Sequence, residues 1–438
     1  MIERACEEDV ACKVIAMLET PDHATIARFV ERHERALAGL FGQVLGLCAE
    51  AGLVRPGVVA IDGTRLAGNA SRESTLSFEE IAREVLAQAK AIDEAEDELY
   101  GDERGDELPE QLRTREGRAE FFGQAREQTV REEPAGGETE TGVSEAVADP
   151  RVAYEFDSER IVARTQRRQG RSREARRQLE QRRWEQPDHV SRSREARLVL
   201  AARRLEAERD AVIAANQAYE QCRATGRDTT GRRLGRRPKP WVAPALPDGV
   251  VSVSDPDSQR MKANLGYVQG YNAQAVVDEG QIVLAAEITN TPTDFSNLEP
   301  MVTATLAELE PVGVAERPKV ELADAQYWNE QHMDEVIANQ HIQVLVKPDS
   351  SGRTAPRPGW TGGRYVWMRT MLAAEHGKAL YRKRMPMIEP VFGHTKHNRL
   401  ITRFHRRGRS AVRTEWRLLM ATHNLAKLHR HQLAAEAV

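Results

Sequence analysis

One short apolar strand stands far from every other strand that the sequence predicts. Residues 58–61, VVAI, lie between a Pro-Gly and an Asp-Gly pair, which is typical of a buried strand bounded by turns. The next clear strands follow residue 250, where YNAQAVVD and QIVLAAEITN precede alternating helices and strands that end at IQVLVKP. Because a single strand cannot bury both of its faces, the first strand is expected to join this later sheet.

The sequence between these two parts therefore reads as an insertion. Residues 78–130 and 155–222 are rich in Ala, Glu, Arg, Leu and Gln, which predicts long polar helices with little core of their own. The stretch EEPAGGETETG separates them, and a Gly/Arg/Pro linker ends near residue 250. We predict an α/β fold, a mixed sheet with flanking helices, in four parts: a helical N-terminal segment 1–55, a first part of the sheet domain 56–75, a charged helical insertion with a basic linker 76–250, and the remainder of the sheet domain 251–432.

Composition excludes several classes of protein. The 438 residues are 40% hydrophobic and 30% charged, which is enough apolar sequence for a core. The absence of a long apolar run argues against a membrane protein, and the acidic start MIERACEEDV is unlike a signal peptide, so a cytoplasmic location is expected. The four cysteines have no zinc-site spacing, which fits a reducing compartment.

The net charge of -4 hides a strong segregation of sign along the chain. Residues 79–149 are strongly acidic, whereas residues 160–237 and 381–431 are strongly basic. Basic blocks of this size in a cytoplasmic protein favour a polyanion partner, most often nucleic acid. Two other interpretations stay open at this point: Arg-rich helix faces that are simply solvated, and an acidic block that neutralises the first basic one.

Two predicted strands each end in an aspartate. Asp62 follows VVAI, and Asp324 follows the strand VELA; in open α/β sheets, ligand sites lie outside strand ends. Carboxylates brought together repel each other unless a hard divalent cation neutralises them. Pro390 suits the first position of a helix, which would place Glu389 at the mouth of that helix with Lys396 on the same face. Taken singly, Asp62 could equally be a turn former and Glu389 a helix-start acid.

These motifs together resemble a known family. IDGT, DPDSQRMK, GYVQGYNAQ, LADAQYW and Y-x2-R-x4-E-P-V-F-G-x2-K, followed by RRGR and HNL, stand in the order found in insertion-sequence DDE transposases, whose ribonuclease H-like catalytic domain is split by an insertion. The resemblance covers most of residues 20–430. It implies that Asp62, Asp324 and Glu389 form a catalytic triad holding two Mg²⁺ ions, with Mn²⁺ as a substitute, for in-line displacement at DNA phosphodiesters.

The resemblance also implies residues that contact DNA. Tyr381, Arg384 and Lys396 match the signature around the third acid, where Arg and Lys suit terminal phosphates. A run of basic residues follows, which we predict to line a phosphate track: Arg403, Arg406, Arg407 and Arg409, with His405 and Arg413. The implied partner is double-stranded DNA, namely the terminal inverted repeats of the element and its target, bound by a homodimer associated with the nucleoid.

The chain departs from the family pattern in two places. Gln326 stands where relatives commonly have Gly, beside the second acid. The chain also starts inside a motif resembling S-S-R-x-I-E-R, so residues 1–55 are expected to be only part of the DNA-binding domain, through a misplaced start or a genuine loss. Trp328 could stack on an unpaired base, although core packing is the favoured interpretation.

Three functions are compatible with the sequence. The first is a DDE transposase that cleaves and joins DNA at the ends of its element. The second is a non-catalytic DNA-binding remnant, and the third is a helical scaffold held together by its acidic and basic arms. Metal-dependent strand cleavage separates the first from the other two, and a steep dependence of DNA affinity on salt separates the second from the third.

Overall fold

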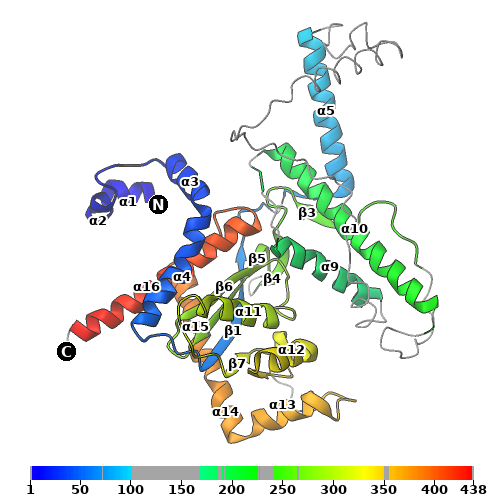
Figure 1. Ribbon diagram of the computed structural model, residues 1–438. Coiled ribbons are helices and arrows are strands. Elements are labelled where there is room, and N and C mark those ends of the chain that lie inside the picture. The colour runs from blue at the N-terminus through cyan, green and yellow to red at the C-terminus, as the bar shows by residue number, and fades with distance from the viewer. Residues whose placement is uncertain are drawn as a thin grey trace, which may run out of the picture. The chain divides into compact units, whose positions relative to one another are not determined.

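The computed structural model describes residues 2–71, 73–100, 168–185, 190–191, 193–224, 226, 241–263, 266–349 and 355–436 (Figure 1). The chain divides into two compact units. The first comprises Met1–Ser77, Glu180–Leu205 and Gly249–Val438, and the second comprises Phe78–Leu179 and Glu206–Asp248. Residues 180–205, which lie inside the predicted insertion, therefore group with the sheet.

The first unit contains a six-stranded mixed sheet. Its strand β1 (Val58–Ala67) pairs in antiparallel fashion with β5 (Gly266–Asp278) and in parallel with β7 (Val320–Ala323). The sheet continues from β7 to the parallel strand β8 (Gln343–Val346), while β4 (Gln259–Ala263) and β6 (Val283–Thr289) both pair with β5. The prediction that the strand carrying Asp62 joins the later sheet is confirmed, and so is the α/β class.

Helices enclose this sheet on both faces. Every residue of β6 is buried, including those on alternate sides of the strand, so neither face of β6 is open to solvent. The packed helices are α11 (Leu298–Leu309), α12 (Glu330–Gln340), α15 (Arg384–Gly393) and α16 (Arg409–Glu436), and α16 lies beside α4 (Glu34–Glu50) in Figure 1. The strand and helix alternation predicted after residue 270 is confirmed.

The N-terminal segment is helical, as predicted. It consists of α1 (Ile2–Glu8), α2 (Val10–Ile15), α3 (His23–Arg32) and α4. Asp22 begins α3 as its N-cap, because its carboxylate accepts a hydrogen bond from the Thr25 amide at 2.6 Å. Gly52, with φ of +70°, follows α4 in the left-handed conformation that commonly ends a helix.

The predicted insertion contributes three described helices. They are α5 (Phe78–Tyr100), α9 (Arg168–Glu185) and α10 (Arg194–Ala224). In the second unit, Ala175, Ala211 and Ala215 form a small buried cluster, and Arg171 donates to Asn216 Oδ1 at 3.0 Å. The stretch EEPAGGETETG and the linker at 231–240 lie outside the described residues.

Smaller elements complete the structure. A two-stranded sheet joins β2 (Thr75–Ser77) to β3 (Val250–Ser252), one strand from each side of the insertion. Near the C-terminus, α13 (Gly363–Ala373) and α14 (Glu375–Arg382) precede α15, and a π-helical turn η2 (His394–Asn398) follows it. Among the described residues, no helix combines the length and apolar character that crossing a membrane requires.

Two local predictions were wrong. The first strand does not end at Asp62, because β1 continues to Ala67 and Gly63 pairs with Gln274 of β5 instead of forming a turn. Pro390 does not begin a helix, because α15 already starts at Arg384. A proline leaves the carbonyl four residues before it without a helical donor, and here the side chain of Gln281 donates to the Pro386 carbonyl at 2.9 Å. In both places a contact from a distant strand or loop overrides the local backbone preference.

Candidate active site

Asp62 and Asp324 meet at one edge of the parallel part of the sheet. The parallel pairing of β1 with β7 ends at Ala60 and Leu322, and each aspartate lies two residues beyond that pair. Burial raises the pKa of Asp62 to about 6, with a further upward contribution from the negative charge of Asp324. The pKa of Asp324 is also raised, mainly by burial. Two electrostatically coupled carboxylates therefore occupy the position where sites form in such sheets.

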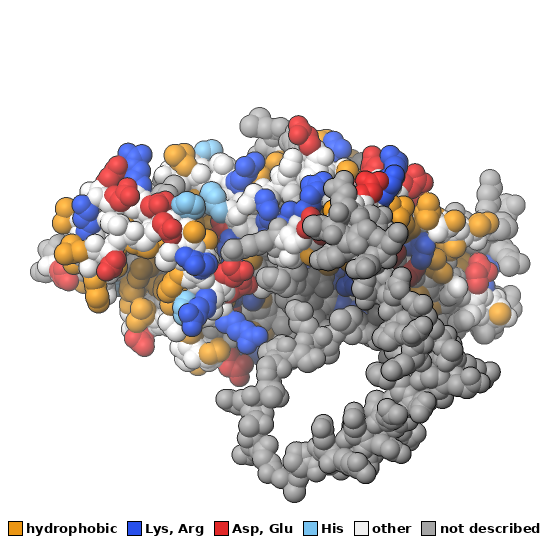
Figure 2. All heavy atoms as spheres, turned by 90° about the horizontal axis from the view of Figure 1, so that it is seen from above, with side chains coloured by type: hydrophobic (Ala, Val, Ile, Leu, Met, Phe, Trp, Pro, Cys, Tyr) orange, Lys and Arg blue, Asp and Glu red, His pale blue; other side chains and the backbone are white. Residues whose placement is uncertain are grey.

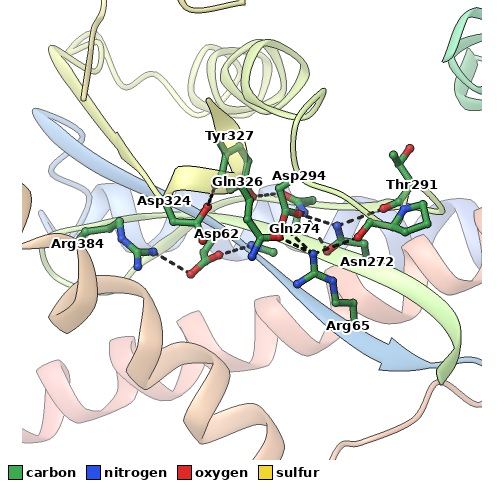
Figure 3. A network of polar contacts seen from close by, with 12 residues as sticks. Asp62, Arg65, Asn272, Gln274, Thr291, Asp294, Asp324, Gln326, Tyr327 and Arg384 are labelled. Carbon is green, nitrogen blue, oxygen red and sulfur yellow. Dashed lines mark hydrogen bonds and ion pairs between the residues drawn. The ribbon is translucent and has the colours of Figure 1, made fainter. Parts of the chain in front are cut away.

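A cation neutralises this pair from α15. Arg384 Nη1 donates to Asp62 Oδ2 at 2.9 Å, and both side chains are largely buried (Figure 3). The charge of Arg384 lowers the pKa of both aspartates and so offsets part of the effect of burial. The structure thus brings Arg384, a predicted phosphate-binding residue, into direct contact with the first predicted catalytic acid.

Two further predicted residues lie around the same acids. The hydroxyl of Tyr381 donates to the backbone carbonyl of Ala323 at 3.0 Å, which fixes α14 to the end of β7 immediately before Asp324. Lys396, in η2, is partly buried, and its pKa is lowered by burial and by the charge of Arg65, while Asp62 acts in the opposite direction. Tyr381, Arg384 and Lys396 therefore lie around Asp62 and Asp324.

Glu389 is placed differently. It lies in the middle of α15, exposed, rather than at the mouth of a helix. Within the described part of the chain, no group of three or more Asp, Glu, His or Cys side chains is arranged to hold a metal ion. The structure therefore brings together the first two predicted acids, and it does not gather Glu389 with them.

Sequence reasoning missed a polar network beside these acids (Figure 3). Its centre is Asp294, which is buried and accepts hydrogen bonds from Arg65, Asn272 and Gln274. Arg65 also donates to Gln326, two residues after Asp324, at 2.9 Å. One signal for this network was present in the sequence: YNAQAVVD places two amide side chains at alternate positions of a strand that is otherwise apolar.

The predicted phosphate track is only partly exposed. Arg403 and Arg407 are exposed, whereas Arg406 forms an ion pair with Glu34 at 2.6 Å. Arg409 is buried, where it forms an ion pair with Glu180 and donates to the Ile288 carbonyl at 3.0 Å. Arg409 therefore stabilises the interior, and its assignment to the surface track is corrected.

Ion pairing extends along α16. Arg413 pairs with Glu287, and Arg417 pairs with Glu287 and Glu308. On the face drawn in Figure 2, Lys and Arg side chains are interspersed with Asp and Glu. The basic block at 381–431 therefore combines structural ion pairs with exposed arginines.

Trp328 belongs to the core. It is buried, and its ring meets that of Tyr365 edge to face with 6.2 Å between centroids. The favoured interpretation, core packing rather than base stacking, is confirmed.

Comparison with known proteins bears on the C-terminal part of the chain. Residues 361–429 match the family model of the transposase DDE domain. The matched stretch contains Tyr381, Arg384, Glu389, Lys396 and the arginines at 403–409, and it supplies the cation that contacts Asp62. No curated protein and no solved structure matches the chain. The match supports a DDE transposase, a member of a family of nucleic-acid-cleaving enzymes.

Proposed function

We propose that this chain is the transposase of an insertion sequence, which cleaves DNA strands at the ends of its element and transfers them with the help of divalent metal ions. One observation carries the proposal. Asp62 and Asp324, far apart in the sequence, come together at the end of two parallel strands, and Arg384 from the segment that matches the transposase DDE domain neutralises them.

The sheet supports a ribonuclease H-like catalytic domain. Its first strand carries an acid and lies between an antiparallel neighbour, β5, and a parallel one, β7, with helices packed on both faces. The second acid follows β7 directly. The long insertion enters after β2 and returns before β3, so the catalytic domain is split in the chain and continuous in space.

The two aspartates fit a hard divalent cation. Both offer oxygen atoms, the ligands that Mg²⁺ and Mn²⁺ prefer, and the pKa of Asp62 stays raised even beside Arg384, so a further positive charge would stabilise the charged pair. We assign Glu389 as the third ligand because it lies in the segment that matches the transposase DDE domain, although the structure holds it exposed on α15 and apart from the two aspartates. When bound, the ions would activate water or a DNA 3′ hydroxyl and stabilise the leaving oxygen.

The remaining residues have separate roles in this proposal. Arg384 and Lys396 bind DNA phosphates beside the acids, and Tyr381 holds the end of β7 in place. Arg403 and Arg407 are the exposed arginines that contact the phosphate backbone. The enzyme acts on double-stranded DNA as a homodimer, in the cytoplasm with the nucleoid.

A non-catalytic DNA-binding remnant is the second candidate. The observation that favours it is the exposed position of Glu389, which is not gathered with the two aspartates. Such a protein would retain the exposed arginines and bind or repress DNA without cutting it.

Cleavage of the element's own end DNA tests the proposal. The full chain, incubated with Mg²⁺ and labelled duplex from either side of its coding sequence, should cut at the element ends. Asp62→Asn and Asp324→Asn should each abolish cutting and preserve DNA binding in a gel-shift assay, because affinity comes from phosphate contacts. Asp334→Asn, which removes an exposed carboxylate of α12 that pairs with Arg364 of α13, is the matched control and should cut normally. DNA binding without any cutting by the unaltered chain would instead support the remnant.

A further inference from the structure

We propose that Asp294 is a positioning residue of the candidate active site, which fixes the turn carrying Asp324 against the strand carrying Asp62. The inference rests on the proposed function and deepens it. It concerns a residue outside the predicted triad, outside the motifs of the sequence and outside the segment that matches the transposase DDE domain.

Asp294 is a fully satisfied buried carboxylate. Its Oδ1 accepts from Asn272 Nδ2 and from Gln274 Nε2, both at 2.7 Å, and its Oδ2 accepts from Arg65 Nη2 at 3.1 Å. Only 1% of the residue is exposed. A carboxylate buried at such depth is costly unless charged and polar donors surround it. The donors come from β1 and β5, so Asp294 connects these two strands to the loop after β6.

Two routes lead from this unit to the turn that carries Asp324 (Figure 3). In the first, Arg65 Nη2 donates to the side-chain oxygen Oε1 of Gln326 at 2.9 Å, and the backbone N–H of Gln326 donates to Asp324 Oδ1 at 2.8 Å. In the second, Gln274 accepts a hydrogen bond from the hydroxyl of Tyr327, which is fully buried at the end of the same turn. Asp294 therefore orients both partners that hold residues 324–327.

Asp294 also packs directly against the strand of Asp62. A Cβ atom on Gly63 would lie 2.5 Å from Asp294 Oδ1 and 2.7 Å from Asn272 Oδ1. Gly63 thus faces the network, and Asp62, its neighbour in an extended strand, points to the opposite face. Both carboxylate oxygens of Asp294 are already engaged by Arg65, Asn272 and Gln274, which is why we assign it positioning and not metal binding.

Metal affinity separates this role from simple structural support. Asp294→Asn preserves the shape of the side chain but presents an amide where Arg65 requires an acceptor. The full chain is titrated with Mn²⁺ alone, without DNA, by calorimetry. Asp294→Asn should weaken Mn²⁺ binding by about 10- to 100-fold, the usual effect of removing a group that orients metal ligands.

Asp257→Asn is the matched control. Asp257 is also buried, pairs with Arg204 and accepts from the Arg409 amide at 2.8 Å, but it belongs to a different network. Asp257→Asn should lower thermal stability about as much as Asp294→Asn and leave Mn²⁺ affinity unchanged. Equal losses of stability with unchanged affinity in both variants would overturn the inference.

A second variant decides the question if Asp294→Asn does not fold. Gln326→Ala removes an exposed side chain and cuts only the Arg65 route, so it should keep the native melting temperature and weaken Mn²⁺ binding several-fold. Unchanged affinity in this variant would overturn the inference. Asp62→Asn separates the inference from the proposed function. If Asp62→Asn also leaves Mn²⁺ binding unchanged, the metal site itself is wrong, and the proposed function and the inference both fail. If only Asp62→Asn loses Mn²⁺ binding, the role of Asp294 alone is refuted.

Discussion

Substitution of Gly63 by Ala tests the packing of the Asp62 strand against the polar network. The added Cβ would lie 2.5 Å from Asp294 Oδ1, 2.7 Å from Asn272 Oδ1 and closer still to Gln274 Nε2. These groups are buried and hydrogen-bonded to one another, so none of them can change rotamer freely to make room for the added atom. The strand or the network must therefore move.

The expected cost follows from two contributions. Overpacking a buried site costs about 1–3 kcal/mol, and displacing Asp294 weakens at least one hydrogen bond to its carboxylate, worth about 1.5–3 kcal/mol. Alanine is intrinsically better than glycine in a strand by up to about 1 kcal/mol, which offsets part of this. Gly63→Ala should therefore destabilise the fold by about 2–5 kcal/mol.

Thermal unfolding of the full chain measures the effect, with Gly39→Ala as the control. Gly39 lies within α4 and its added Cβ would meet nothing within 4 Å, so alanine there should stabilise the helix by up to about 1 kcal/mol. The two midpoints should move in opposite directions, by about 1–2 °C for each kcal/mol in a unit of this size. A Gly63→Ala midpoint at or above that of the unaltered chain would refute the close packing.

Three further predictions concern buried and exposed charges. Burial raises the pKa of Glu321 from 4.5 to about 8, so the folded state favours the protonated form. Stability should therefore fall by up to about 5 kcal/mol as the pH rises from 4.5 to 8. Glu321→Gln should remove this dependence of the melting temperature on pH. Combined Arg403→Ala and Arg407→Ala should reduce the log-log salt slope of DNA binding by up to about two units at unchanged stability. Arg409→Ala should have the opposite profile. It should lower stability by about 3–5 kcal/mol, because Glu180 loses its ion pair with Arg409, and leave the salt slope of DNA binding unchanged.

The strands and helices of the sheet domain were predictable because their patterns report burial directly. A run such as VLAAEIT is apolar at nearly every position, and β6 is buried at every position. The aspartates that end such runs were equally visible, as was the need for the first strand to find partners elsewhere. These inferences use only the local period of apolar residues.

Local signals failed where a distant group decides the conformation. The Asp-Gly pair predicted a turn, but Gly63 is extended because β5 pairs with it. Pro390 predicted a helix start, but the side chain of Gln281 takes up the carbonyl that the proline leaves free. Arg409 looked like its neighbours in a basic run, yet burial beside Glu180 gives it a different role.

By itself, then, the sequence determined the α/β class, the acid-bearing strands and the resemblance of its C-terminal signature to a transposase. Only the tertiary structure decided which polar groups meet: that Arg384 reaches Asp62, that Asp294 joins Arg65 to Gln274, and that Glu389 stays apart. The physical reason is that helix and strand periods are set by neighbours a few residues away, whereas hydrogen bonds in a site depend on strand pairing and helix packing between distant parts of the chain.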